Sequence, residues 1–319
     1  MFKKFFNAIA HPVEPIPTPR PRLEVMFKWL MFTACILLLG YMSALYPIQA
    51  NIPFIVIPSI LVLLFAKPVL FEKMKLTTLV VVRMFCVVCV IVGVTSSGFD
   101  MRQFYVDLVQ LALVVNILEA TFTDLLRHKK YFNAVSGFFL ALGTIGLKGH
   151  WLMVNGAVVN DPLGFNYYLV FGATNYATIC YIIGYTIWNW IFVTDEFSPS
   201  VSLMHVGFLL SPILGCLLSM AFGNTANPFG LWLLLRANTL SIGGWLQIGC
   251  KDWFEKEFYD EKFAKFIEWV HTTPVQIVCM LACVGLMLAC IIPAFTVVSN
   301  YMPFGFQLEP WLYNISTWG

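Results

Sequence analysis

The stretch VVNILEATFTDLLRHKK, residues 114–130, begins as apolar sequence and ends in a cluster of basic residues. Aliphatic side chains in its first half are typical of a helix that crosses lipid, and a basic cluster marks the cytoplasmic end of such a helix. Asn116, Glu119 and Asp124 nevertheless lie where hydrocarbon is expected. The stretch therefore predicts a membrane helix that carries polar groups into the bilayer.

The composition of the whole chain agrees with this interpretation. Of the 319 residues, 59% are hydrophobic and 11% are charged, and the mean hydropathy is +0.79. A soluble domain does not expose so much apolar surface. The net charge of +2 says little about partners, because the placement of charge matters more than its sum in a membrane protein. No nucleic-acid surface is suggested; the expected partners are membrane lipids and a small-molecule solute.

A membrane-spanning helix needs about 20 apolar residues. By this rule the sequence predicts an all-α, polytopic integral membrane protein with about nine transmembrane helices. The predicted spans lie near residues 26–46, 52–71, 76–97, 103–126, 132–154, 167–194, 200–221, 228–249 and 275–299.

The basic residues predict the orientation, because Lys and Arg gather on the cytoplasmic side. With a cytoplasmic N-terminus, only Arg102 and Lys148 lie in outside loops, and the C-terminus is outside. Arg83 and Arg236 lie within the membrane. The protein is accordingly expected in the cell membrane, plasma or bacterial inner. The predicted inside residues are Lys3, Lys4, Arg20, Arg22, Lys28, Lys67, Lys73, Lys75, Arg127, Lys129, Lys130, Lys251, Lys256, Lys262 and Lys265.

Three regions follow from these spans. Residues 1–25 form a basic, proline-rich cytoplasmic tail, residues 26–299 the transmembrane domain, and residues 300–319 an aromatic tail outside the cell. Within the domain, residues 252–270 predict one cytoplasmic amphipathic helix that lies on the membrane or docks a partner. Its predicted apolar face consists of Tyr259, Phe263, Phe266, Ile267 and Val270.

Two hairpins of the chain resemble each other. FTDLLRHKK (122–130) leads into SGFFLALGTIG (136–146), and FVTDEFSPS (192–200) leads into VGFLLSPILG (206–215). The offset is about 70 residues and both hairpins run in the same direction, as a parallel duplication would produce. Chance similarity between two apolar hairpins explains the pattern equally well.

The charged groups inside the membrane need partners, because an ionised side chain at the bilayer centre costs roughly 2.5–3.5 kcal/mol on insertion scales. Arg83 and Glu119 both lie roughly 10 Å deep from the cytoplasmic side, on neighbouring antiparallel spans. We therefore expect an Arg83–Glu119 ion pair. Such a pair either fixes helix register only or belongs to a functional cavity.

Helical phase gathers other polar residues on shared faces of the fourth, fifth, sixth and eighth spans. We expect the third, fourth, sixth, seventh and eighth spans to enclose a polar cavity. Arg236 would pair with Asp107 or remain free for an anion. The predicted solute-binding residues are Arg83, Asn116, Glu119, Asn175, Asn189, Trp232, Arg236 and Thr239.

Proton coupling is assigned to Glu119, His205 and Asp107, since a carboxylate or imidazole inside a cavity can exchange protons with water. No nucleotide-binding, metal-binding or nucleophile motif is present in the sequence. We therefore predict no catalytic residue, no metal and no cofactor.

The nine cysteines are interpreted as packing residues within apolar helices. In the ninth span, cysteines alternate with small residues, a pattern that suits close helix packing or a homo-oligomer. The cysteines of that span are Cys279, Cys283 and Cys290.

Three functions are compatible with this pattern. The preferred hypothesis is a secondary transporter or binder of a small polar, anionic or zwitterionic solute. The second is an intramembrane enzyme acting on a lipid or isoprenoid, with a carboxylate or His205 as acid or base. The third is a channel, sensor or assembly subunit in which the intramembrane charges are structural.

Overall fold

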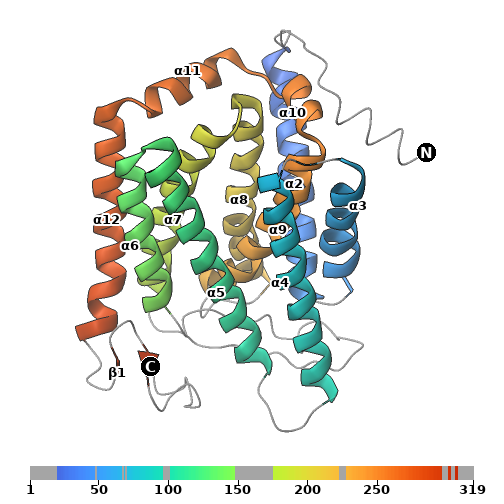
Figure 1. Ribbon diagram of the computed structural model, residues 1–319, viewed down its shortest axis with the longest axis vertical. Coiled ribbons are helices and arrows are strands. Elements are labelled where there is room, and N and C mark those ends of the chain that lie inside the picture. Colours follow the sequence, from blue (N-terminus) through green and yellow to red (C-terminus); the bar gives the residue numbers. More distant parts are fainter. Residues whose placement is uncertain are drawn as a thin grey trace.

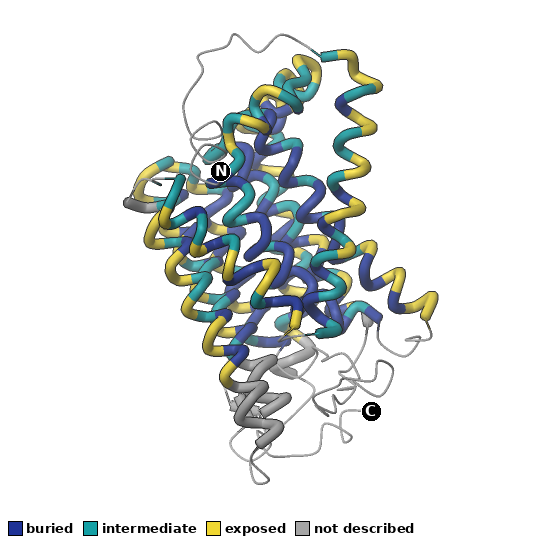
Figure 2. The backbone as a smooth tube through the Cα atoms, turned by 90° about the vertical axis from the view of Figure 1, so that its right-hand side faces the viewer, coloured by how far each residue is buried: buried dark blue, intermediate teal, exposed yellow. Residues whose placement is uncertain are grey.

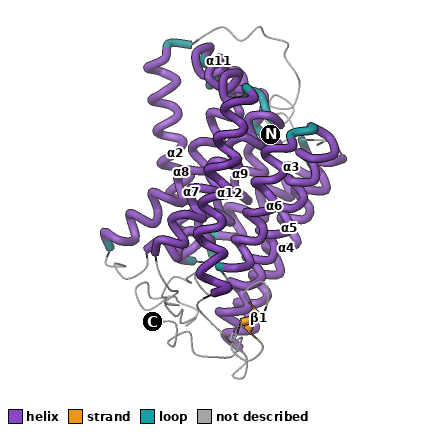
Figure 3. Tube along the Cα trace, turned by 90° about the vertical axis from the view of Figure 1, so that its left-hand side faces the viewer, coloured by secondary structure: helices purple, strands orange, loops and turns teal. Residues whose placement is uncertain are grey.

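The computed structural model describes residues 20–46, 49–66, 68, 70–95, 101–147, 175–222, 228–296, 301–302 and 306–307, without the side chains of 70–71, 89–95, 101–107, 175 and 293–296. Nearly all of this is helical (Figure 3), so the predicted all-α class is confirmed. Two two-residue strands, β1 (Tyr301–Met302) and β2 (Phe306–Gln307), form an antiparallel pair. Residues 1–19 and the rest of the 300–319 tail lie outside the described residues.

The described helices follow one another along the chain. In chain order they are α2 (Arg22–Leu45), the π-helical turn η1 (Ile52–Val56), α3 (Ile57–Phe65), α4 (Leu70–Thr95), α5 (Met101–Thr123), the π-helical turn η2 (Asp124–His128), α6 (Tyr131–Gly146), α7 (Asn175–Glu196), α8 (Pro199–Ala221), the 3-10 turn η3 (Pro228–Leu231), α9 (Trp232–Gly249), α10 (Lys251–Glu257), α11 (Glu261–Val270) and α12 (Thr273–Thr296).

Five helical segments among the described residues are long and apolar enough to cross a membrane, which indicates a membrane protein. Each of the nine predicted spans overlaps at least one described helix. A nine-fold crossing, its orientation and the hairpin repeat stay predictions. The five segments are Arg22–Leu45, Leu108–His128, Tyr176–Glu196, Pro199–Ala221 and Thr273–Ile292.

The helices form two packed groups that share one core. α2 packs on α8 and α9, while α12 packs on α6 and α7 (Figure 1). α7 contacts α8, and α5 contacts α4, α6 and α9, so the two groups are joined. Buried residues concentrate along the middle of the bundle, and exposed ones lie on its outer helices (Figure 2). The outward side chains are largely apolar, as lipid contact requires.

The predicted amphipathic helix is divided into α10 and α11. The Asp260 side chain accepts a hydrogen bond from the Phe263 backbone N–H at 2.8 Å, which caps the start of α11. Phe254 and Phe258 are buried, so α10 belongs to the bundle. α11 crosses one end of the bundle toward α12 (Figure 1), and its Phe266 is exposed.

Ion pairs attach the start of α2 to this segment. The Glu257 carboxylate forms ion pairs with Arg20 at 2.7 Å and with Lys28 at 2.6 Å. Arg22 forms an ion pair with Asp260 at 3.0 Å. These residues are partly exposed, where single ion pairs contribute little. The phenylalanines beneath them therefore supply more of the attachment than the charges do.

Gly137 tests the packing of α5, α6 and α7. A Cβ at this position would lie 2.0 Å from Thr121 Oγ1 and 2.7 Å from Trp188 Nε1. Overpacking costs about 1–3 kcal/mol, whereas replacing a helical glycine by alanine gains only about 1 kcal/mol. We expect Gly137→Ala to lower the thermal unfolding midpoint of the detergent-purified protein.

Gly285→Ala is the matched control, because no atom lies within 4 Å of a Cβ at that position of α12. We expect this variant to be as stable as the wild type or slightly more stable. Equal midpoints for the two variants would contradict the close approach of α5, α6 and α7.

Candidate functional site

Arg236 of α9 lies at the centre of the bundle and is fully buried. Its guanidinium donates to the Tyr185 hydroxyl at 3.1 Å, to Asn189 Oδ1 at 3.2 Å and to the Phe208 carbonyl at 3.3 Å. The Tyr185 ring centroid lies 5.3 Å from the guanidinium carbon, within cation–π range. All of these described partners are neutral, so the positive charge of Arg236 is solvated but not cancelled.

The predicted Asp107 partner cannot be placed beside Arg236, since the Asp107 side chain lies outside the described residues. Among the described carboxylates, none forms an ion pair with Arg236. The same limit applies to the side chain of Asn175.

A chain of hydrogen bonds continues from Arg236 toward the end of the bundle where α11 lies. Asn189 Oδ1 also meets His205 Nε2 at 2.8 Å, and Gln247 Nε2 meets His205 Nδ1 at 2.7 Å. An amide nitrogen only donates, so Nδ1 accepts and Nε2 carries the imidazole hydrogen. The contacts therefore describe a neutral His205 that donates to Asn189.

A cavity of ≈30 Å³ adjoins this chain of hydrogen bonds. It lies between α4, α5, α7, α8 and α9, the helices that overlap the predicted third, fourth, sixth, seventh and eighth spans. Its polar lining residues are Lys75, Asn116, Asn189, His205 and Gln247, and its apolar ones are Leu79, Ala120, Phe192, Val193, Phe197, Leu240 and Gly244.

Lys75 gives the cavity its charge. Its ammonium nitrogen lies 6.0 Å from the centroid of the Phe192 ring. Among the described residues, none forms a hydrogen bond or ion pair with this ammonium, although Glu119 and Glu196 act on it through space. No described carboxylate lines the cavity. Lys75 is therefore the basic side chain that the described lining residues bring to the cavity.

Lys75 was absent from the predicted site because it immediately precedes the third predicted span, residues 76–97. There the sequence assigns a lysine to the cytoplasmic boundary. Whether such a residue faces water, headgroups or a cavity depends on how the neighbouring helices pack.

The expected Arg83–Glu119 ion pair is wrong. Arg83 is buried and turns toward α9, where Nε donates to Ser241 Oγ at 3.0 Å and Nη1 donates to Asn238 Oδ1 at 2.7 Å. Glu119 is exposed on α5 and forms no ion pair with a described residue. The prediction relied on the similar depth of the two residues. Because α4 packs on α9, Arg83 instead contacts side chains of α9.

Two further predicted residues pack behind the cavity. Trp232 is buried against Tyr181 and Tyr185, with ring centroids 5.8 Å and 5.0 Å away. The hydroxyl of Thr239 donates within α9 to the Arg236 carbonyl at 3.1 Å. Neither residue lines the cavity. Of the predicted solute-binding set, Asn116 and Asn189 do, and Arg236 contacts Asn189 from behind.

A second polar cluster could hold a metal ion. Asp124 and His128 of η2 and Asp195 of α7 offer ligand atoms that all lie within 4.8 Å of one another. These residues do not line the cavity. No metal motif is visible in the sequence here, because Asp195 of α7 is far along the chain from the other two ligands.

Comparison with known proteins adds no identity: no protein-family model, curated protein or solved structure matches the chain.

Asn189 is expected to be essential to the buried hydrogen bonds. Asn189→Leu removes the oxygen that accepts hydrogen bonds from both His205 and Arg236. Each buried polar group left without a partner costs about 1–3 kcal/mol of folding free energy. We expect a large fall in the thermal unfolding midpoint.

Asn116→Leu is the control, since Asn116 lines the same cavity without a hydrogen bond from its side chain to a described residue. Its midpoint should change little. If the two leucine variants unfold at the same temperature, the Arg236–Asn189–His205 connection does not exist as described.

Proposed function

We propose that the protein is a multi-pass transporter or binder of a small anionic or zwitterionic solute in the cell membrane. In this proposal the chain crosses the membrane about nine times, with the N-terminus in the cytoplasm. The solute binds in the cavity between α4, α5, α7, α8 and α9, near the cytoplasmic side. Lipids surround the bundle, and self-association through α12 remains part of the proposal.

The observation that carries the proposal is Lys75. A lysine ammonium with no described hydrogen-bonding partner faces a cavity whose other polar groups are neutral. Partial burial lowers the local dielectric constant and so strengthens attraction to an anion. A carboxylate or phosphate group would supply the hydrogen-bond acceptors that Lys75 lacks, while Asn116 and Gln247 offer amide groups for the remaining polar atoms of the solute.

Arg236 supports the site from behind. Its neutral partners leave its charge uncompensated among the described residues, so it contributes a positive potential at the cavity. Because its guanidinium is already held by three oxygens, it acts at a distance and need not touch the solute.

His205 is the predicted proton carrier that touches the cavity. Protonation would place a hydrogen on Nδ1, and the Gln247 amide nitrogen could no longer donate to it. The amide would have to turn and present its oxygen. Proton binding would thus rearrange two groups of the cavity wall, which gives a physical route for coupling a proton to solute binding. In the proposal Glu119 and Asp107 lie outside this step.

The size of the cavity implies a conformational change. A volume of ≈30 Å³ corresponds to about one water molecule, so a solute enters only after the helices move apart. Pro212 lies inside α8, where it removes one backbone hydrogen bond and allows the helix to bend. In the proposal, bending at Pro212 moves the part of α8 that carries His205.

Lys75→Gln provides the test. The purified protein is screened by thermal shift against inorganic phosphate, carboxylic acids from acetate to citrate and amino acids, and uptake of any stabilising compound is measured in proteoliposomes. A hydrogen bond to a charged group contributes about 1.5–3 kcal/mol. We therefore expect Lys75→Gln to weaken binding by at least about 10-fold.

Lys73→Gln is the matched control, because Lys73 is exposed on the same helix. It should bind the solute as the wild type does. If no anion stabilises the wild type, or if both glutamine variants lose binding equally, the cavity is not an anion site. Stabilisation by a lipid alone would favour the intramembrane enzyme instead.

A further inference from the structure

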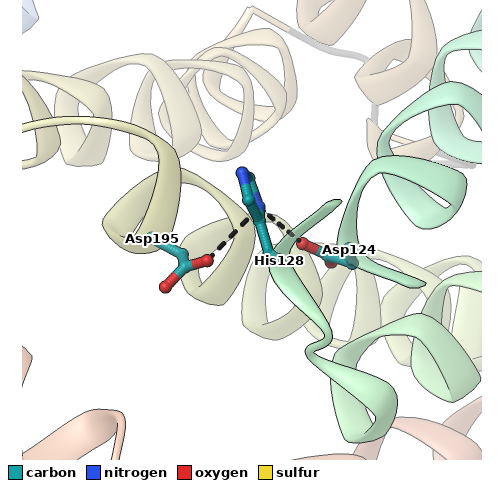
Figure 4. Close-up of side chains that lie close together, drawn as sticks. All are labelled: Asp124, His128 and Asp195. Atoms are coloured by element: carbon teal, nitrogen blue, oxygen red, sulfur yellow. Dashed lines mark ion pairs between the residues drawn. The ribbon is translucent and has the colours of Figure 1, made fainter. Parts of the chain in front are cut away.

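The cluster where α5 and α7 end is separate from the proposed solute cavity. Figure 4 shows His128 between the carboxylates of Asp124 and Asp195. Asp124 is the first residue of the π-helical turn η2 and His128 is the last, so both side chains project from one turn. Asp195 comes from the last turn of α7.

The local backbone explains why these ligands converge. π-helical turns are rare and occur often at functional sites. Here η2 is followed by Lys129, whose φ of 56° lies in the left-handed region, and the chain reverses into α6. The reversal brings Asn133 of α6 back onto Asp124, where its amide donates to Oδ2 at 2.6 Å.

The atoms that face the centre of the cluster lack hydrogen bonds. The Asp124 side chain is fully buried, and its Oδ1 has no hydrogen-bonding partner; the same is true of His128 Nδ1. These two atoms are 3.6 Å apart, and Asp195 Oδ2 lies 3.3 Å from the same nitrogen. A buried carboxylate oxygen without a partner is costly, which points to a missing ligand.

The spacing of these atoms suits a metal ion. Zinc binds imidazole nitrogen and carboxylate oxygen at about 2.0–2.2 Å, which places tetrahedral ligand atoms roughly 3.4 Å apart. The separations of 3.3 and 3.6 Å are close to this value. We propose that Asp124 Oδ1, His128 Nδ1 and Asp195 Oδ2 bind one divalent transition-metal ion, with a free position for water.

The ligand chemistry selects the class of ion. One imidazole among carboxylates favours zinc or another first-row transition metal, whereas magnesium and calcium prefer all-oxygen sites. Lys130 holds one ligand in place, because its ammonium contacts the other oxygen of Asp195 at 2.8 Å. The Glu196 carboxylate lies close to the far nitrogen of His128, with Oε2 3.1 Å from Nε2 but without a hydrogen bond between them.

Without a metal ion, the cluster would require a protonated His128. A protonated His128 would form ion pairs with both aspartates, and the cluster would then only join α5 to α7. That arrangement needs no metal and gives no metal spectrum.

Cobalt is the probe, because Co²⁺ replaces Zn²⁺ in nitrogen and oxygen sites and absorbs visible light there. The full chain is purified in detergent without affinity-tag histidines, stripped with a chelator and titrated with Co²⁺, and bound Co²⁺ is then displaced with Zn²⁺. We expect one bound ion with a visible absorption band. Asp195→Asn and His128→Gln should weaken binding by at least about 10-fold.

Two further variants make the result decisive. Asp195→Glu keeps a carboxylate and should retain the absorption band. His271→Gln is the control, because His271 lies at the same end of the bundle and contacts Thr194 at 2.9 Å, and burial lowers its pKa. Its removal should leave Co²⁺ binding unchanged.

The proposal is overturned by any of three results. The wild type gives no Co²⁺ band, the band persists unchanged in Asp195→Asn and His128→Gln, or His271→Gln loses it as well. Because Asp195 is partly exposed, its asparagine variant is expected to fold, and an unchanged thermal midpoint without metal verifies this.

Discussion

The burial of Arg236 is the constraint around which the centre of the bundle is arranged. A guanidinium without solvent must be supplied with acceptors, since each unmade hydrogen bond costs about 1–3 kcal/mol. The acceptors come from Tyr185 and Asn189 of α7 and from the backbone of α8 at Phe208. α7, α8 and α9 are therefore fixed relative to one another, and Asn189 in turn orients His205 at the cavity.

The two buried arginines, Arg83 and Arg236, are both held by neutral groups among the described residues. Arg83 uses an amide and a hydroxyl of α9, as Arg236 uses a phenol, an amide and a carbonyl. Neutral partners stabilise the guanidinium without removing its charge. The described interior thus contains two buried positive charges, on Arg83 and Arg236. Lys75 adds a third positive charge at the cavity. This distribution is the basis on which we propose an anionic or zwitterionic solute.

Two acidic residues, Asp124 and Asp195, lie away from these cations, where α5 and α7 end. Asp124 and Asp195 each follow a threonine at the end of a helix, the arrangement that suggested two related hairpins. The structure brings the two aspartates to opposite sides of His128. A duplication would account for this symmetry, and the repeat itself stays a prediction. The proposed metal would join the two hairpins at the end of the bundle opposite α12's C-terminus.

The sequence by itself determined the membrane character and the helices, because long apolar segments can satisfy their backbone in lipid only as helices. It also indicated Asn116 and Asn189 as interior residues through helical phase and His205 through its depth, although the same phase placed Glu119 inside, where the structure leaves it exposed. Tertiary structure alone decided the partners. Several neighbouring helices offer polar groups at the same depth, so depth could not show that Arg83 turns to α9 and away from Glu119. Nor could it show that Lys75 faces a cavity, or that Asp195 meets His128, since these contacts depend on which helices pack together.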